Sequence, residues 1–449
     1  MKKLTVLSLL FLVLVLAVSA CQPQVKEVVV TKEVIVEKEV VVTPTAAPSG
    51  PVKITVWSYL VPDTYPQPLP LYEAKIAEFK AAHPGVEVEW VSIPYEGSDA
   101  KLTSAFASRT NAPDIWHGKQ TYFAGGLGVA DPAPEAVAKC WDENAVDVIK
   151  PYMQYDGKYY GFPIETDLGM MLYYNKAMFV EAGLDPEKPP TTIDELLDYA
   201  QKLTKPDGSQ FGFGVRYTGN PRGIADKWLP FLHAWGGRLY AEDESTSEGF
   251  LNSPEAIESL QFYGDLVNKY KVSSTAVGKP ENAFLEKQVA MLFREAFMVG
   301  VIRDGAPDIE YGVAPLPEKN ANPGVSILFQ DGYMVYKFSP NKDLAWELVN
   351  MLTCDEKLSL EQAKAMGSLP TFKGLFYSDP YVTERPDYLA EKEILENPPS
   401  PYYGHPYINE ISFRVGQAVE EVMFGLKTAE QALNDAVPDV DEILAKTAK

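Results

Sequence analysis

The pattern of apolar and polar positions in residues 156–203 predicts a turn, a strand and a helix in succession. Asp156-Gly157 is typical of a tight turn, because glycine adopts a positive φ at no steric cost. The apolar and aromatic run Met170–Tyr174 indicates a buried strand. Asn175 can cap the helix that follows, and Gly183 can end it.

A second helix is predicted after Pro189-Pro190, which break the chain. Thr192 and Glu195 have the spacing of a capping box, in which each side chain bonds to a backbone N–H at the helix start. The apolar residues that follow lie on one side of such a helix: Leu196, Leu197, Ala200 and Leu203.

A strand, a helix and a second strand open the globular part. Val52–Trp57 and Val86–Trp90 alternate as strands do. The helix between them places Tyr72, Ile76 and Phe79 on one face and ends at His83-Pro84-Gly85. This order predicts a parallel βαβ unit. Further helices are predicted from Ser253-Pro254 onward, over Leu344–Leu352 and within Val415–Leu444.

Length and charge limit the class of protein. A chain of 449 residues exceeds one ordinary hydrophobic core and favours two lobes. Its 46% hydrophobic and 23% charged residues are normal for a soluble globular protein. The net charge of −22 becomes −24 if Lys2 and Lys3 leave with a signal peptide. A nucleic-acid partner is not expected, because phosphate binding needs clustered Lys and Arg.

The N-terminus has the form of a targeting segment. Lys2-Lys3 precede the apolar run Leu4–Ala17, which is too short for a comfortable transmembrane helix. Val18–Cys21 matches a bacterial lipobox, in which Cys21 becomes the acylated first residue. We therefore expect a lipoprotein signal peptide over residues 1–20 and an anchor of several acyl chains. An ordinary signal peptide with a chance cysteine is the alternative.

Residues 26–43 contain a six-residue repeat, KEVVVT, KEVIVE, KEVVVT. An even period keeps the same side chains on the same face of an extended chain. Three copies are too few for a solenoid core, so we expect residues 21–50 to form a tether that ends in the flexible spacer Thr43–Gly50. A self-associating β stalk is the alternative.

Several segments together closely resemble the extracellular solute-binding proteins of ABC importers, above all their sugar-binding group. The motifs are DGK at 156–158, YYNK at 173–176, AGL at 182–184, PPTT at 189–192, VAPLP at 313–317 and SLPT at 368–371. The resemblance implies an α/β, periplasmic-binding-protein-like fold, with two α/β lobes, a hinge and a ligand cleft between the lobes. It places residues 51–163 and 323–378 in lobe 1, and residues 164–322 and 379–449 in lobe 2.

Two cysteines remain beside Cys21, namely Cys140 and Cys354. They either pair in an oxidising compartment or stay as buried free thiols. The resemblance places both segments in the first lobe, which makes pairing geometrically feasible.

Candidate ligand residues follow from general rules for sheets and sugars. In open α/β sheets ligands lie beyond the carboxyl ends of strands, and two lobes can close on them about a hinge. Sugars offer hydroxyls and flat C–H faces, so their sites combine planar hydrogen-bonding groups with aromatic plates. The strand ends supply Trp57, Tyr59, Asp114, Trp116 and His117. Local packing, or turn capping for Asp114, is the alternative role.

The resemblance adds further candidates. Glu165 and Asp167 precede the predicted strand, where similar proteins place a sugar-binding carboxylate; a solvated loop is the alternative. Phe297 aligns with an aromatic stacking plate of the family, and Arg294 precedes it. The remaining candidates are Asp331, which stands where a Gly-Gly turn is common, Tyr402 in a Pro-rich loop, and Trp228 and Trp235. The two tryptophans bracket an expected strand end, and a core position is the alternative for one of them.

Catalytic and metal motifs find little support in the sequence. There is no G-x-S-x-G elbow, no P-loop and no G-x-G-x-x-G. The four histidines lack the spacing of zinc ligands. We therefore expect a binding protein with no enzymatic activity, no metal and no cofactor.

The expected function is a receptor that captures a sugar or oligosaccharide and delivers it to an ABC permease. We expect a monomer on the extracytoplasmic side of the cell membrane, at the cell surface or in the periplasm. Its partners would be the ligand, the permease subunits and the membrane through Cys21. One alternative is the same fold binding a polyamine or another charged solute, and another is a surface-anchored carbohydrate-active enzyme.

Overall fold

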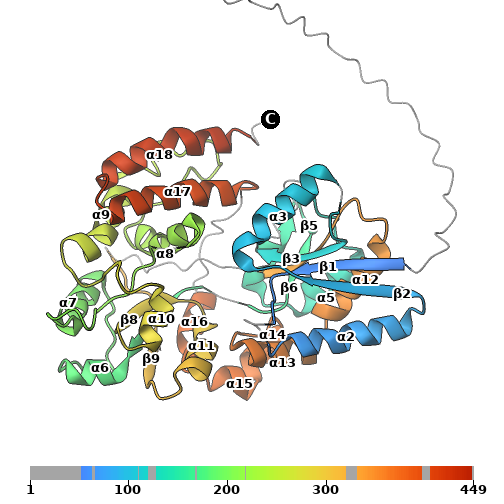
Figure 1. Ribbon diagram of the computed structural model, residues 1–449, viewed down its shortest axis with the longest axis horizontal. Coiled ribbons are helices and arrows are strands. Elements are labelled where there is room, and N and C mark those ends of the chain that lie inside the picture. Colours follow the sequence, from blue (N-terminus) through green and yellow to red (C-terminus); the bar gives the residue numbers. More distant parts are fainter. Residues whose placement is uncertain are drawn as a thin grey trace, which may run out of the picture. The chain divides into compact units, whose positions relative to one another are not determined.

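The computed structural model describes residues 52–62, 66–109, 111–119, 128–166, 169–217, 219–319, 331–396 and 405–446. All of these belong to one compact unit, Gly50–Lys449 (Figure 1). The predicted signal peptide, acylated Cys21 and tether lie outside the described residues, as do the candidates Asp167 and Tyr402. Within the described ranges, no helix is both long and apolar enough to span a bilayer.

A five-stranded sheet organises the first lobe, in the order β2-β1-β3-β10-β6. Strand β1 runs parallel to β2 and β3, whereas β10 runs antiparallel to β3 and β6. The predicted parallel βαβ unit is therefore confirmed. The strands are β1 (Val52–Ser58), β2 (Val86–Ser92), β3 (Ile115–Lys119), β6 (Gly161–Pro163) and β10 (Asp331–Val335).

A three-stranded sheet organises the second lobe, with β7 (Met171–Asn175) between β8 (Met291–Arg294) and β9 (Tyr311–Ala314). Both neighbours run antiparallel to β7. Strand β7 is buried on both faces, because Leu172 belongs to one hydrophobic cluster and Tyr173 to another. The predicted buried strand is confirmed. The predicted turn at Asp156-Gly157 joins the short hairpin β4 (Gln154–Tyr155) and β5 (Lys158–Tyr159).

Helix ends follow the predicted caps. Asn175 Oδ1 accepts a hydrogen bond from Met178 N at 3.1 Å, and Thr192 forms the full capping box with Glu195. The helices, in chain order, are α2 (Leu69–Ala82), α3 (Tyr95–Ser108), α5 (Glu135–Asn144), the 3₁₀ helix η1 (Asp147–Met153), α6 (Lys176–Glu181), α7 (Ile193–Leu203), α8 (Pro221–Ala234), α9 (Pro254–Asn268), α10 (Pro280–Leu285), α11 (Met298–Gly305), α12 (Lys342–Thr353), α13 (Glu356–Met366), α14 (Lys373–Ser378), α15 (Pro380–Thr383), α16 (Tyr388–Glu396), α17 (Ile408–Met423) and α18 (Ala429–Leu444).

The segment around Trp228 differs from the expectation of a strand end, because it lies inside helix α8. Asn220 caps this helix, and Pro221 occupies its first position. Helix α8 packs against α9 and α17, so its side chains are buried almost all round (Figure 1). A helix buried all round shows no polar stripe in its sequence, and a proline inside it, here Pro230, argues against a helix in a sequence pattern.

The segment that joins the two sheets lies beside the loop that follows α13. Residues 164–170 follow β6 and lead into β7. In this crossing Thr166 N donates to Leu369 O at 2.9 Å. Thr166 and Leu369 therefore form a single antiparallel bridge between the crossing and the segment 367–371. The lobe boundaries proposed from the sequence stay a prediction.

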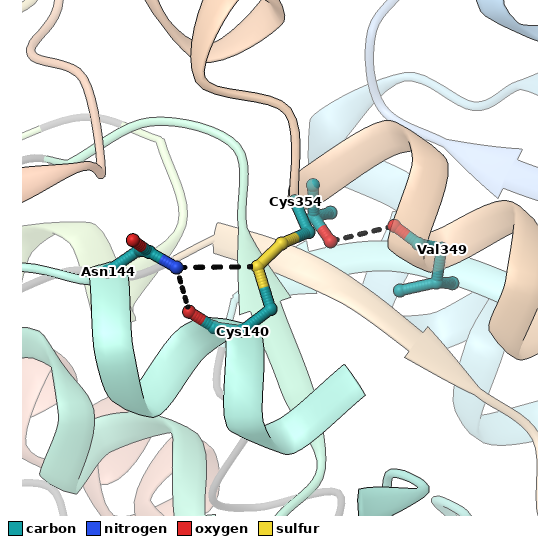
Figure 2. Close-up of a disulfide and its surroundings, with 5 residues drawn as sticks. Cys140, Asn144, Val349 and Cys354 are labelled. Carbon is teal, nitrogen blue, oxygen red and sulfur yellow. Dashed lines mark hydrogen bonds between the residues drawn. A yellow bond between two sulfur atoms is a disulfide. The ribbon is translucent and has the colours of Figure 1, made fainter. Parts of the chain in front are cut away.

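Cys140 and Cys354 form a disulfide between helix α5 and the end of helix α12 (Figure 2). Their Cα atoms lie 6.5 Å apart, within the usual range for a disulfide. The bond joins positions 214 residues apart in the sequence. Of the two alternatives left by the sequence, the structure has the paired one.

Candidate functional site

One edge of the first-lobe sheet gathers four candidates. Strands β1, β3 and β6 end there, and the antiparallel β10 begins there with Asp331. In the register, Tyr333 lies opposite His117, and Gly332 lies opposite Pro163. The candidates at this edge are Tyr59, His117, Glu165 and Asp331. This is the edge at which α/β sheets bind ligands.

Aromatic stacking holds this edge together. The ring of His117 lies between the rings of Tyr59 and Tyr333, with centroid distances of 4.3 and 4.7 Å. Ser58 Oγ lies 3.0 Å from His117 Nδ1. The hydroxyl of Tyr59 donates to Asp331 Oδ2, so the stack orients a carboxylate at the edge.

His117 is a neutral histidine in this setting. Its exposed fraction is 2%, and burial lowers its pKa to about 3. A neutral ring stacks on tyrosine and carries no charge into the sheet. We therefore assign it to support of Tyr59 rather than to proton transfer.

Glu165 follows β6 and is largely buried. It interacts electrostatically with Tyr72 on α2. The pKa of Tyr72 is raised well above its usual value, mainly by burial and further by Tyr333 and Glu165. The carboxylate thus lies beside phenol groups at the same edge as Asp331.

Trp57 and Trp116 lie on the other face of the sheet. They are register partners in β1 and β3, and Trp116 stands next to His117 along an alternating strand. Trp116 packs on Phe106 of α3 at a centroid distance of 4.9 Å. The structure therefore does not bring these two tryptophans together with Tyr59 and His117.

Asp114 bonds to the backbone and to a neighbouring loop. Its Oδ2 accepts from Thr55 N at 2.9 Å, and its Oδ1 accepts from Ser339 Oγ at 2.5 Å. The two oxygens thus tie strand β1 to the loop after β10, which is a structural role. Its contact with a ligand stays a prediction.

The end of β8 in the second lobe carries a buried group of charges. Lys227 Nζ on α8 lies 2.5 Å from Glu295 Oε1. Arg294 Nη1 lies 3.2 Å from Glu295 Oε2, and Arg294 Nη2 lies 3.8 Å from Glu281 Oε1. We call Arg216, Lys227, Arg294, Glu281 and Glu295 the charged cluster, because all five interact electrostatically.

Burial lowers the pKa of one member of the charged cluster, and neighbouring cations lower that of another. Burial lowers the pKa of Lys227 to about 8, although the carboxylate of Glu295 opposes the shift. For Glu281, burial alone would raise the pKa, but the nearby cations led by Arg294 outweigh burial and lower it. Glu281 is therefore a carboxylate, and Lys227 loses its charge at a lower pH than an ordinary lysine.

Phe297 lies beside this cluster as the cap residue of helix α11. The guanidinium carbon of Arg294 lies 4.7 Å from the centre of its ring, a cation–π contact. The ring is only half-buried. Arg294 and Phe297 are thus together, as predicted, at the end of β8.

The two sheet edges are linked by a short stretch of chain. Residues 164–170 join Pro163, at the end of β6, to Met171, which is paired with Arg294. A fully extended chain of this length spans less than about 30 Å. The first edge and the strand paired with β8 are therefore neighbours along the chain.

Trp228 lies within helix α8, and Trp235 is the cap residue at its end. Trp228 is fully buried, and its indole N–H donates to Ser259 Oγ at 3.2 Å. Trp235 lines a pocket of about 500 Å³ formed by α8, α9 and the start of α18. The other residues lining this pocket include none of the sequence-derived candidates.

Sequence reasoning missed Tyr333 and four members of the charged cluster, namely Arg216, Lys227, Glu281 and Glu295. Lys227 gave one signal, because a lysine within the apolar run ADKWLPFL is unusual. The acids gave no comparable signal among so many others. Within the described residues, no group of three His, Cys, Asp or Glu side chains is arranged to hold a metal ion.

Residues 65–357 match the model of the bacterial extracellular solute-binding protein family, and the chain belongs to this family. It is 24% identical over 356 residues to a maltotriose-binding protein of Pyrococcus abyssi, covering 76% of this chain and 71% of that protein. It is 27% identical over 305 residues to the sn-glycerol-3-phosphate-binding periplasmic protein of Escherichia coli, covering 62% of this chain and 66% of that protein.

A solved structure shows the same architecture. It is an ABC transporter solute-binding protein of Thermotoga lettingae bound with α-D-tagatose, with a TM-score of 0.75 and 26% identity. The match covers 88% of this chain and 100% of that one. The predicted fold is confirmed as periplasmic-binding-protein-like, and these relatives are named as binding proteins rather than as enzymes.

Proposed function

We propose that this protein is a membrane-anchored, extracytoplasmic receptor that binds a sugar or oligosaccharide and delivers it to an ABC permease. The observation that supports the proposal is the set of side chains found at one edge of each sheet. Asp331 and Glu165 stand at the strand ends of one lobe, and Phe297 stands at the strand end of the other. Carboxylates that accept from hydroxyls, together with an aromatic plate, are what a sugar ring needs.

Membrane attachment would come from acylation of Cys21, at the end of the lipobox. The acyl chains would hold the protein at the membrane beside the permease, and the repeat-containing segment would act as a tether. Detergent phase partitioning tests this part of the proposal. The native protein should enter the detergent phase, and a Cys21→Ser variant should stay in the aqueous phase. Aqueous partitioning of the native protein would contradict the anchor.

A thermal-shift screen tests the ligand class, with maltotriose, maltose, tagatose, sn-glycerol 3-phosphate, spermidine and amino acids as probes. At a hundredfold excess over Kd, a ligand stabilises the folded state by about 2.7 kcal/mol. For a domain of this size, that raises Tm by about 3 °C. A rise in Tm with sugars alone supports the proposal, and no rise in Tm with any probe contradicts it. An assay for unchanged recovered sugar then separates binding from hydrolysis.

Two variants test the residues. Asp331→Asn and Phe297→Ala should each weaken sugar affinity by roughly 10- to 100-fold, because each removes a contact worth about 1.5 to 3 kcal/mol. Asp439→Asn and Phe413→Ala are matched controls, since Asp439 pairs with Arg414 on the surface and Phe413 is 44% exposed. Equal losses in all four variants would contradict the site.

A second candidate is a phosphorylated polyol, and the charged cluster favours it. The cluster holds the cations Arg216, Lys227 and Arg294 against the carboxylates Glu281 and Glu295. Guanidinium and ammonium groups are the side chains that bind phosphate oxygens in proteins. The relative named for sn-glycerol 3-phosphate agrees with this direction. A shift with sn-glycerol 3-phosphate alone would select this candidate, and a shift with spermidine alone would reject both.

A further inference from the structure

Arg385 lies in the short connection between α15 and α16 and is largely buried. Its Nε donates to Asp387 Oδ1 at 2.9 Å, and its Nη2 donates to Asp387 Oδ2 at 2.6 Å. Burial would lower the pKa of Arg385, but Asp387 outweighs it and raises the pKa further above its usual value. The guanidinium therefore stays charged and is fixed in one plane by a bidentate pair.

The remaining donors of Arg385 reach two other segments. Nη1 donates to the carbonyl oxygens of Gly367 and Ser368, both at 2.9 Å. Nη2 donates to Ala296 O at 3.2 Å. The ring of Tyr381 lies under the guanidinium, 5.3 Å from its central carbon. One side chain thus ties the start of α11 to the segment after α13.

The segment bonded to Nη2 is the corner that carries Phe297. Tyr173 OH donates to Glu295 O at 3.2 Å, so two successive carbonyls of this corner receive buried donors. Helix α11 starts here without a side-chain cap. The orientation of Phe297 therefore depends on the bonds from Tyr173 and Arg385.

The segment bonded to Nη1 leads to Glu165. Residue Leu369, next to Ser368, accepts from Thr166 N at 2.9 Å. Thr166 is the neighbour of Glu165 in the crossing between the lobes. A path of one backbone hydrogen bond and several hydrogen bonds from the Arg385 side chain thus runs from the neighbour of Glu165 to the corner of Phe297.

A direct contact between backbone atoms also brings helix α11 close to the segment after α13. Gly367 has φ of +76°, and a Cβ atom placed there would lie 2.3 Å from Gly300 Cα on α11. Only glycine at both positions permits this approach. The contact sets how closely α11 approaches the segment after α13, and the hydrogen bonds of Arg385 set how the two are oriented relative to each other.

We propose that Arg385 is a positioning residue for the ligand site, which fixes the spacing between the backbone at Glu165 and the aromatic ring of Phe297. It contacts no ligand itself and acts through the corner at Ala296 and the carbonyls of Gly367 and Ser368. The ligand part of this inference rests on the proposed function, whereas the clamp itself does not.

Hydrogen exchange of the ligand-free, full-length protein in detergent tests the clamp. In Arg385→Lys, an ammonium can still pair with Asp387 but cannot bond to the three carbonyls at once. Amides of residues 297–305 should then exchange roughly tenfold faster or more, because charge-assisted hydrogen bonds are lost. Arg414→Lys is the matched control, since Arg414 pairs with Asp439 on α17 and α18. A rise spread evenly over the chain, or no rise at 297–305, would overturn the inference.

A double variant guards against misfolding. Arg385→Met with Asp387→Leu removes the buried ion pair as a unit, which proteins often tolerate. If Arg385→Lys does not fold, this variant should show the same local exchange at residues 297–305. Unchanged exchange there would overturn the clamp.

Maltotriose binding tests the positioning role. If the wild type binds maltotriose, Arg385→Lys should weaken Kd by about tenfold and Arg414→Lys should leave it unchanged. Local exchange without a change in Kd would overturn the role at the ligand site. If the wild type does not bind maltotriose, that result counts against the proposed ligand, and hydrogen exchange still decides whether the clamp exists.

Discussion

Replacing His117 by asparagine should reduce the loss in free energy of unfolding that occurs as the pH falls. In the folded protein, burial lowers the pKa of His117 to about 3, whereas its ordinary value is 6.5. Between these values the unfolded chain takes up a proton that the folded chain does not bind. The free energy of unfolding therefore falls as pH falls from 6.5 toward 3, and this loss belongs to His117.

The magnitude follows from the same two values. One proton taken up only by the unfolded state costs about 1.4 kcal/mol of stability per pH unit. Between pH 6.5 and pH 4 the contribution of His117 is about 3 kcal/mol. Asparagine does not titrate, and it keeps a polar group near Ser58, but it loses stacking on Tyr59 and Tyr333. The variant should therefore start less stable at pH 7 and lose less on acidification.

Urea unfolding followed by circular dichroism at pH 4, 5, 6 and 7 measures this effect. The quantity of interest is the difference between wild-type and variant free energies of unfolding at each pH, which cancels the other titrating groups. Ser58→Ala is the control, because it disturbs the same stack and keeps the imidazole. Parallel wild-type and His117→Asn curves between pH 6.5 and 4 would refute the assignment of His117 as buried and neutral.

Three further changes test other parts of the structure. The pKa of Lys227 is lowered to about 8, so between pH 8 and 10.5 the folded protein has lost a proton that the unfolded chain still binds, and the free energy of unfolding rises with pH. Lys227→Met should remove this rise of about 3 kcal/mol, as measured by urea unfolding. Serine at both Cys140 and Cys354 should cost up to about 5 kcal/mol by loop entropy, and a reductant should bring the wild type to the same midpoint. Gly367→Ala should lower Tm by several degrees more than Gly425→Ala, because both glycines have positive φ but only Gly367 faces backbone at 2.3 Å; equal losses would contradict the close contact.

Local structure was largely predictable from the sequence. The cap at Asn175, the capping box at Thr192 and the turn at Asp156-Gly157 all form as predicted. Each depends on residues within a few positions of one another, so no distant contact can easily override it. The family motifs likewise depend on local order, and they led to the fold that the comparison confirms.

Side-chain faces at the strand ends were decided by the sheet. His117 and Trp116 are adjacent in sequence, yet one lies with Tyr59 and the other packs on Phe106. Alternation within a strand sends neighbours to opposite faces, and only pairing tells which face meets which partner. Proximity to a strand end therefore did not separate ligand candidates from packing residues.

The sequence by itself determined the local elements, the family and the expectation of two lobes, because these follow from short-range patterns. Only the tertiary structure decided that Cys140 pairs with Cys354, that Lys227 meets Glu295, and that Arg385 joins three separate segments. These contacts link residues far apart in the chain, and their formation depends on how helices and sheets pack. That packing is a property of the whole core, which no local pattern encodes.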